Sequence, residues 1–392
     1  MNQCLPSRIY LARVCLAVAA VTSPALLTAQ VPSPPDKPAA EIGSPPSKST
    51  TQIPSPANKP GGTLTIQRTE RRLGRESVAV ARGLRLLVDN RTTGRITVRG
   101  WNQDVVEARA TSDRGDEVLM IAQNENDGPK IIFLKADYAN LENPETPTQE
   151  LERPPVGVDG PIQVHLEVNV PRNTDLEVVK VIRSNVEITG VETPIIVIGH
   201  SSNVTLKDVG SVEVHTRTGS ITIDNARGIT DVTSSTGAIK IANSRGAVRA
   251  VSIAGPIEVR CVKGRTDVSN TQAPIELVGI DGDVEAIAAS SNVRFTGPIS
   301  ADTRYYLKSM SGRVEMIVPA NSRGFNATLT SYRNTVESDF SLSPKPAVQD
   351  AHAAGQRLSG RFGNGSAQIT LDSFEGLVKL SKVAPASIVS CP

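Results

Sequence analysis

Aromatic residues are scarce: the chain has one tryptophan, five tyrosines and six phenylalanines among 392 residues. Sugar-binding clefts often stack rings on aromatic faces, so this scarcity disfavours a large carbohydrate cleft. An excess of charge of one sign is also missing. Without residues 1–29, which contain two arginines and no acid, 40 basic residues stand against 40 acidic ones. This balance argues against a broadly basic surface, and we expect no nucleic-acid partner.

Motifs for catalysis and cofactor binding are missing as well. No Gly-Xaa-Ser-Xaa-Gly elbow, phosphate loop or dinucleotide fingerprint occurs in a strand-to-helix context. No cysteine or acid completes metal-ligand spacing around the four histidines. They are His165, His200, His215 and His352. We therefore predict that the chain is not an enzyme and has no catalytic residue, cofactor site or metal site.

Aspartates near turns raise the separate question of calcium. They are Asp208, Asp224, Asp281 and Asp283. The glycine-rich nonapeptide of calcium-binding β-rolls is missing, so we expect these side chains to cap turns.

The N-terminus predicts export. Arg8 and Arg13 precede an apolar, small-residue run ending near Ala29, which is typical of a signal peptide over residues 1–29. The alternative, a membrane anchor, would need roughly 20 apolar residues, more than this run offers. We expect an extracytoplasmic chain, whether periplasmic, on the cell surface or secreted, without stable membrane insertion after signal removal. Residues 30–66, rich in proline and serine, are predicted to be a disordered linker.

Cysteine is rare, with four residues in the chain. Cys4 and Cys15 fall in the signal peptide, which leaves Cys261 and Cys391. An exported protein can oxidise such a pair, but spacing alone leaves a disulfide and two free thiols equally open.

A repeat of about 18 residues dominates the chain beyond residue 175. Two apolar residues flank one polar residue at each step, which is the alternation of a strand with one buried face. The pairs are Val186/Ile188, Val204/Leu206, Ile221/Ile223, Ile239/Ile241, Ile257/Val259, Ile275/Leu277 and Val293/Phe295. The segment Ser235–Gly246, STGAIKIANSRG, suggests an anion-binding loop when taken alone. Its glycines and isoleucines recur in neighbouring coils, so we interpret it as one ordinary coil.

A glycine follows four of the seven first members by seven residues, at Gly228, Gly246, Gly264 and Gly282, and a second alternation follows the glycine. We expect these glycines to supply positive φ at one turn geometry repeated in each coil. A repeat of strand, turn, strand, turn predicts an all-β fold, namely a single-chain parallel β-helix with about 18 residues per coil. A triangular hexapeptide helix would need apolar residues at positions that Arg227, Arg245 and Lys263 occupy. We therefore expect a flattened solenoid with two main faces; its handedness does not follow.

The ends of the solenoid are less regular. We assign residues 67–174 to an N-terminal β region that opens the solenoid, 175–324 to regular coils, and 325–392 to a C-terminal β region with the final coil. Strands are expected within Leu84–Ala110, Lys130–Lys135 and Ile162–Val170. Glu142–Pro155 is interpreted as an excursion and Pro344–Gly365 as a loop.

Five features in order resemble a bacterial family of exported β-solenoid domains of unknown function that carry the label "putative adhesin". They are GRITVRGWN at Gly94–Asn102, the strand end at Val170 and Pro171, the Gly-Xaa-Ile-Xaa-Ile repeat, SGRVEMIVP at Ser311–Pro319, and the last coil, with Gly363, Asn364 and Gly365 ahead of Ile369, Thr370 and Leu371. The resemblance covers roughly residues 82–382. It implies a parallel β-helix outside the cytoplasm and, through the label, adhesion. It brings no catalytic residues.

Two candidate surfaces stand out. The first is a predicted stack of charges at one outward position, formed by Asp231, Arg249, Asp267 and Glu285. Asp267 and Glu285 one coil apart would match the carboxyl spacing of a retaining glycosidase, but a solvated face with alternating charges explains them better. The second is an aromatic group expected to cap the last coil. Its members are Tyr305, Tyr306, Tyr332, Phe325 and Phe340.

The sequence thus favours a non-catalytic exported β-solenoid that acts as an adhesin-like or structural binding module at the cell envelope. Its partner would be an envelope component, a surface or a glycan, which the sequence does not name. Two alternatives stay open: a polysaccharide-acting enzyme on a β-helix face, and a scaffold that self-associates through the solenoid ends.

Overall fold

A computed structural model describes residues 75–79, 85–90, 93–112, 118–124, 131–138, 163–181, 183–343, 349–350, 355–387 and 391 of the chain. The predicted signal peptide (1–29), the linker (30–66), the excursion Glu142–Pro155 and His352 lie outside the described residues.

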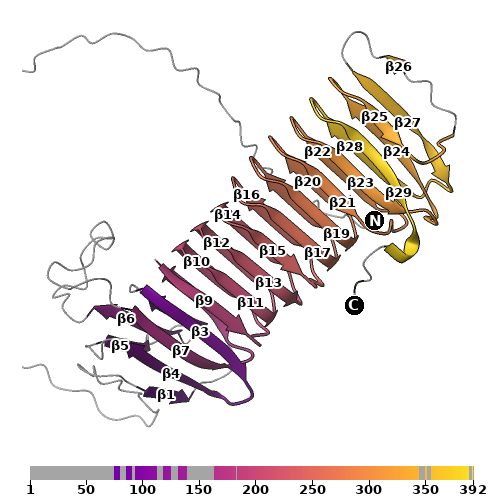
Figure 1. Cartoon of the computed structure of the whole chain (residues 1–392). Coiled ribbons are helices and arrows are strands. Elements are labelled where there is room, and N and C mark those ends of the chain that lie inside the picture. The colour runs from indigo at the N-terminus through magenta and orange to yellow at the C-terminus, as the bar shows by residue number, and fades with distance from the viewer. Residues whose placement is uncertain are drawn as a thin grey trace, which may run out of the picture. The chain divides into compact units, whose positions relative to one another are not determined.

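Two long sheets form the solenoid, and each coil contributes one strand to each sheet (Figure 1). Sheet A contains, in stacking order, β1 (Arg75–Ala79), β4 (Val105–Ser112), β7 (Gln163–Pro171), β3 (Thr93–Trp101), β9 (Arg183–Thr189), β11 (Val204–Val209), β13 (Ile221–Ala226), β15 (Ile239–Ala242), β17 (Ile257–Lys263), β19 (Ile275–Asp281), β21 (Val293–Thr296), β23 (Val314–Pro319), β29 (Val378–Val383) and β25 (Val336–Ser338). Strands β9 to β29 pair in parallel, so the predicted β-helix is confirmed.

Sheet B faces sheet A across the core and follows the same rungs, where a rung is the level of one strand in the stack. In stacking order it contains β26 (Gln349–Asp350), β27 (Gln356–Gly363), β24 (Gly324–Ser331), β28 (Ala367–Ser373), β22 (Arg304–Ser309), β20 (Val284–Ala288), β18 (Thr266–Asn270), β16 (Val248–Ser252), β14 (Thr230–Thr236), β12 (Val212–Thr218), β10 (Ile195–Ser201), β8 (Asp175–Val181), β2 (Arg85–Asn90), β6 (Ile131–Tyr138) and β5 (Val118–Asn124).

The core is made by the predicted apolar pairs, which stack in register. Ile221 pairs with Ile239 and Ile223 with Ile241 on the next rung, and all four side chains are buried. Burying a side chain of this size contributes about 1.5–3 kcal/mol, so the repeated pairs are a main source of stability. The polar residue that separates the two apolar members of each pair lies outward on sheet A, as the alternation predicts.

The predicted reason for the glycine repeat is wrong for two of its four members. Gly264 and Gly282 have positive φ, whereas Gly228 and Gly246 do not. Close stacking of the turns requires glycine here instead: a Cβ on Gly246 would lie 2.3 Å from the carbonyl oxygen of Gly228, one coil earlier. The absence of a side chain thus lets the backbones of successive turns approach each other.

At the N-terminal end, the order of rungs departs from the order of the sequence. Strand β3 lies between β7 and β9, and β2 lies between β6 and β8. The coil formed by β2 and β3 is therefore enclosed by two later coils. Beyond them, β4 and β1 add to sheet A, and β5 adds to sheet B, in antiparallel pairs.

The C-terminal end repeats this insertion. The last coil in sequence, β28 and β29, lies between the β22–β23 coil and strands β24 and β25. The predicted loop over Pro344–Gly365 is wrong for Gln356–Gly363, which forms β27 antiparallel to β24. This strand alternates polar residues and glycines with few apolar ones, so its sequence carries no strand periodicity.

The aromatic cap is confirmed for two of its predicted members. Phe325 packs against Phe340, with ring centroids 5.1 Å apart, and Phe362 joins them. Tyr305 is instead a core residue whose ring contacts Phe295. Tyr306 lies outward, on the rung next to Glu285. The remaining member, Tyr332, is exposed.

The C-terminus returns to the middle of the solenoid. After the short 3₁₀ turn η1 (Pro385–Ser387), Cys391 forms a disulfide with Cys261 in β17. This settles the question that cysteine spacing left open.

Candidate binding surfaces

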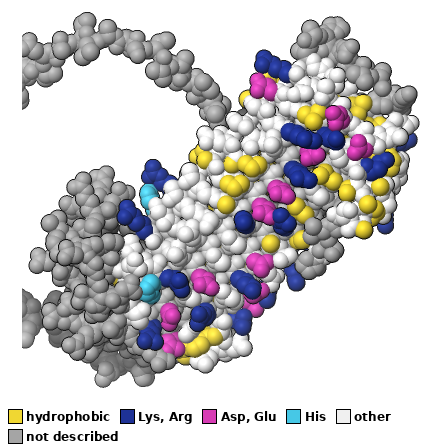
Figure 2. All heavy atoms as spheres, viewed as in Figure 1, with side chains coloured by type: hydrophobic (Ala, Val, Ile, Leu, Met, Phe, Trp, Pro, Cys, Tyr) yellow, Lys and Arg dark blue, Asp and Glu magenta, His cyan; other side chains and the backbone are white. Residues whose placement is uncertain are grey.

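The predicted charge stack lies on the outward face of sheet B. Asp231, Arg249, Asp267 and Glu285 pair in register on four successive rungs. Arg249 donates to Asp231 at 3.2 Å, between side chains that are both partly exposed. Acidic and basic side chains are interspersed in the same manner over the visible face of the coils (Figure 2). Charge is therefore balanced locally as well as over the whole chain.

Arg265 engages the two carboxylates that lie in register on successive rungs, Asp267 and Glu285. Its guanidinium donates to Asp267 at 2.9 Å and lies 3.5 Å from Glu285. The hydrogen bond and charge of Asp267 are the main causes that raise the pKa of Arg265 above its ordinary value. Both acids are thus held by one arginine, which directly precedes β18, on an open strand face.

The predicted turn aspartates each accept a hydrogen bond from a neighbouring coil. Asp281 accepts from the hydroxyl of Ser300 at 2.6 Å, and Asp283 accepts from the backbone of Arg304 at 2.8 Å. Asp208 and Asp224 accept from side-chain amides, as described below. These bonds connect one coil to another, so for the four aspartates the structure shows contacts between coils in place of the expected capping of their own turns.

His200 and His215 lie on neighbouring strands of sheet B, β10 and β12. His215 lies beside Glu213 at 2.8 Å, and His200 is exposed. Within the described ranges, no group of three His, Cys, Asp or Glu side chains is placed to hold a metal ion.

One corner of the coil, near the C-terminal ends of the sheet A strands, has the same left-handed conformation on five rungs. The φ angles are 54° at Asp208, 58° at Asn225, 56° at Asn243, 54° at Cys261 and 64° at Gly279. Asn and Asp tolerate this region better than most residues because their short side chains can hydrogen-bond locally. The corner therefore selects small polar residues or glycine at intervals of one coil.

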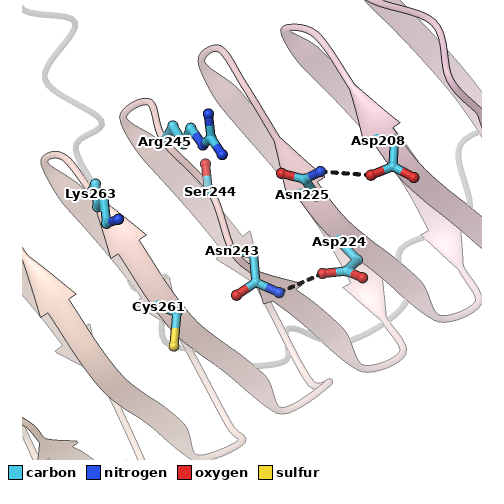
Figure 3. A pocket seen from close by; sticks show the side chains of 8 residues that line it. All are labelled: Asp208, Asp224, Asn225, Asn243, Ser244, Arg245, Cys261 and Lys263. Carbon is cyan, nitrogen blue, oxygen red and sulfur yellow. Dashed lines mark hydrogen bonds between the residues drawn. The ribbon is translucent and has the colours of Figure 1, made fainter. Parts of the chain in front are cut away.

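Side-chain bonds connect these corners from coil to coil. The Asn225 amide donates to Asp208 at 2.6 Å, and the Asn243 amide donates to Asp224 at 2.8 Å (Figure 3). Each aspartate belongs to an earlier coil than the asparagine it binds. The corner is thus a continuous polar surface with fixed side-chain positions.

A groove of about 390 Å³ follows these corners across four rungs (Figure 3). Its lining residues are Asp208, Asp224, Asn225, Asn243, Ser244, Arg245, Cys261 and Lys263. We call it the corner groove. The STGAIKIANSRG segment supplies three of the eight residues. The sequence does not reveal this role, because each residue occupies an ordinary position of the repeat and the groove arises only when four coils stack.

A second surface lies at the other corner, after the sheet B strands. Met310, Phe374 and Tyr332 are 60%, 43% and 46% exposed. They follow Ser309, Ser373 and Ser331, which pair in register on adjacent rungs, so the three apolar side chains stand in one row. We call these three residues the aromatic row.

Side-chain contacts hold the rings of the row. The rings of Tyr332 and Phe374 are 5.8 Å apart, and the Arg333 guanidinium lies 4.9 Å from the centre of the Phe374 ring. Arg333 also pairs with Glu375 at 3.3 Å. Polar groups therefore border the apolar row.

Buried serines fix the backbone beneath the row. The Ser373 hydroxyl accepts from the backbone of Gly376 and donates to the carbonyl of Gly312, both at 2.9 Å. Ser331 in turn donates to the carbonyl of Gly376 at 2.8 Å. Each serine hydroxyl thus forms hydrogen bonds with backbone groups of its own turn and of the turn on the neighbouring rung. This arrangement gives the exposed row a rigid support.

Among the residues described, no helix has the length and apolar character that crossing a membrane would require.

Comparisons with known proteins assign no family to this chain. The sequence matches no family model and no curated protein. Among solved structures, it is similar to a protein of Clostridium sporogenes described as a putative cell adhesion protein, with 9% identity over 80% of this chain and 100% of that chain. The TM-score is 0.18, too low to carry an argument about shared fold or function.

Proposed function

We propose that the chain is an exported, non-catalytic solenoid that acts as an adhesin-like binding module at the cell envelope, with the aromatic row as its contact surface. The observation that carries the proposal is the row itself. Met310, Phe374 and Tyr332 expose large apolar surface side by side, although the fold has a continuous core in which to bury such side chains. Clustered exposed apolar residues mark interaction sites more often than single ones do.

The composition of the row suits a protein or envelope surface. Aromatic residues, methionine and arginine are enriched at the centres of interfaces, and Arg333 and Glu375 provide a polar rim. The hydrogen-bonded serines hold the row in place before binding, so little conformational entropy would be lost on contact. Rigid support of this kind favours affinity.

Two further observations support the proposal. The Cys261–Cys391 disulfide is typical of proteins in oxidising compartments outside the cytoplasm, in agreement with the signal-like N-terminus. The acids on successive rungs, Asp267 and Glu285, are both engaged by Arg265 on an open strand face. This arrangement favours binding over the enzymatic alternative.

The test is a binding screen of the purified, oxidised chain against peptidoglycan, lipopolysaccharide, capsular polysaccharide and intact bacterial and epithelial cells. A Tyr332→Ser/Phe374→Ser variant removes the row, and Ile229→Ser is the control because Ile229 is an exposed apolar side chain outside the row. We expect the double variant to lose about tenfold in affinity or more, equal to about 1.4 kcal/mol, and the control to bind as the unmodified chain does.

Two results would contradict the proposal. One is the absence of binding to every member of the panel. The other is concentration-dependent self-association in sedimentation that the double variant abolishes, because the row would then join two copies of the chain.

A further inference from the structure

We propose that the corner groove binds a saccharide that carries a carboxylate. The site is separate from the aromatic row: it lies at the corner near the C-terminal ends of the sheet A strands, on the rungs of β11, β13, β15 and β17. Four features of the groove point to this ligand class. They are a cation and a buried hydroxyl that have no partner among the described residues, a line of hydrogen-bond acceptors, and the sign of the surrounding charge.

Arg245 supplies the cation. One coil earlier, Arg227 occupies the same corner position and pairs with Glu192 at 2.9 Å. The side chain of Arg245 has no ion pair or hydrogen bond with any residue that the structure describes, and it lines the groove (Figure 3). A guanidinium can bind a carboxylate through two parallel hydrogen bonds, so Arg245 is suited to hold the acidic group of a ligand.

Asparagine and aspartate side chains supply the acceptors. Asn225 and Asn243 use an amide N–H to bind Asp208 and Asp224, which leaves the amide oxygens and the second carboxylate oxygens along the groove. Such oxygens accept hydrogen bonds from hydroxyl groups. They recur at the rung spacing of about 4.8 Å, close to the repeat of sugar rings in an extended glycan, so successive rings can meet successive rungs.

Ser244 supplies a hydroxyl that the fold itself does not use. The residue is 1% exposed, lines the groove, and its Oγ has no hydrogen-bond partner in the part of the chain that the structure describes. The corresponding positions of the coils before and after hold Ala226 and Val262, which are buried and apolar, so folding does not require a hydroxyl there. A buried polar group without a partner is unfavourable, and a ligand that offers one offsets that cost.

The charges of the groove narrow the ligand further. Asp208 and Asp224 oppose a compact dianion such as phosphate, while Arg245 and Lys263 oppose a free metal cation. A sugar acid combines one negative charge with several hydroxyl donors. It therefore matches both the cationic side chains and the acceptor oxygens of the lining. The groove is open along the coils and crosses four of them, which suits a segment of a polymer.

The test compares acidic oligosaccharides with the same oligosaccharides after methyl esterification, which keeps the hydroxyls and removes the charge. The probes are hexamers of galacturonate and of mannuronate, hyaluronan hexamers and sialyllactose, titrated by calorimetry into the oxidised full chain. We expect at least one acidic oligosaccharide to bind. The affinity of its methyl ester should be lower by a factor of about ten or more.

Three variants locate the site. Arg245→Ala is expected to weaken binding of the acid about tenfold, whereas Arg217→Ala, which removes an exposed arginine outside the groove, leaves it unchanged. Ser244→Ala is expected to weaken binding without lowering the thermal midpoint of the free chain, since the hydroxyl that it removes has no partner. Binding that the esters share equally, binding that Arg245→Ala leaves intact, or no binding by any probe would each overturn the proposal. None of these results depends on the aromatic row.

Discussion

Cys391 and Cys261 are joined by a disulfide across 130 residues of sequence. Cys261 is one of the five corner residues with left-handed φ, and Gly279 takes that position on the next rung. A Cβ on Gly279 would lie 2.4 Å from the sulfur of Cys391, so the glycine leaves the space in which the disulfide lies. The end of the chain is thereby fixed to the corner that also forms the groove.

Loss of this bond should destabilise the solenoid. Cys391→Ser is expected to lower the free energy of unfolding by about 2–4 kcal/mol, because the unfolded chain gains the freedom of a long open loop. Thermal unfolding with and without reductant measures the effect. The reductant should lower the midpoint of the unmodified chain to that of the variant. Equal midpoints for the oxidised chain and the variant would contradict the prediction.

Gly246 should not tolerate a side chain. In Gly246→Ala the new Cβ would lie 2.3 Å from the backbone oxygen of Gly228, so the stacked turns must move apart. We expect a loss of about 1–3 kcal/mol in denaturant unfolding, the usual cost of overpacking. Ala247→Ser, at the adjacent exposed position, is the control and should change little. A Gly246→Ala chain as stable as the unmodified one would show that the turns are not closely stacked.

Ser373, beneath the aromatic row, should contribute more to the free energy of unfolding than the size of its side chain suggests. Ser373→Ala leaves the backbone N–H of Gly376 and the carbonyl of Gly312 without a partner. Leaving one buried and one partly buried group unpaired should cost about 1–3 kcal/mol. The matched control is Ser269→Ala, an exposed serine in β18. The same small effect from both substitutions would contradict the supporting role that we assign to Ser373.

The outward charges should contribute little by comparison. Arg249 and Asp231 form a 3.2 Å pair whose side chains are 61% and 34% exposed. A double-mutant cycle with Arg249→Ala and Asp231→Ala should therefore give a coupling of under about 1 kcal/mol that falls as salt is added. A larger coupling that does not depend on salt would mean that the charged face is a main source of stability.

The regular coils could be predicted from the sequence because their signal is local and repeated. The step from Ile221 to Ile239 to Ile257 fixed both the coil length and the register that the structure shows. The order of rungs at the two ends could not be predicted. The pairing of strands such as β3 and β28 is determined by contacts between residues that are distant in sequence. The 18-residue period carries no information about these contacts.

The candidate surfaces were less accessible from sequence than the fold. Tyr332 was expected in the cap but is exposed beside Phe374, because the register places both after buried serines at the corner. In the sequence, Ser244 and Arg245 occupy ordinary corner positions of the repeat. They become part of a groove only when the neighbouring coils stack against them. A serine at a position where other coils have alanine or valine was the signal within the repeat that could have identified the groove.

Hydroxyl-radical footprinting tests the proposed contact surface most directly, because methionine, tyrosine and phenylalanine are among the side chains that such radicals oxidise. In the free chain, Met310, Tyr332 and Phe374 should be oxidised readily, as their exposure requires. When the chain is bound to the envelope component that retains it, we predict strong protection of all three and unchanged oxidation of Ile229. Continued oxidation of the row in the bound chain would contradict the account.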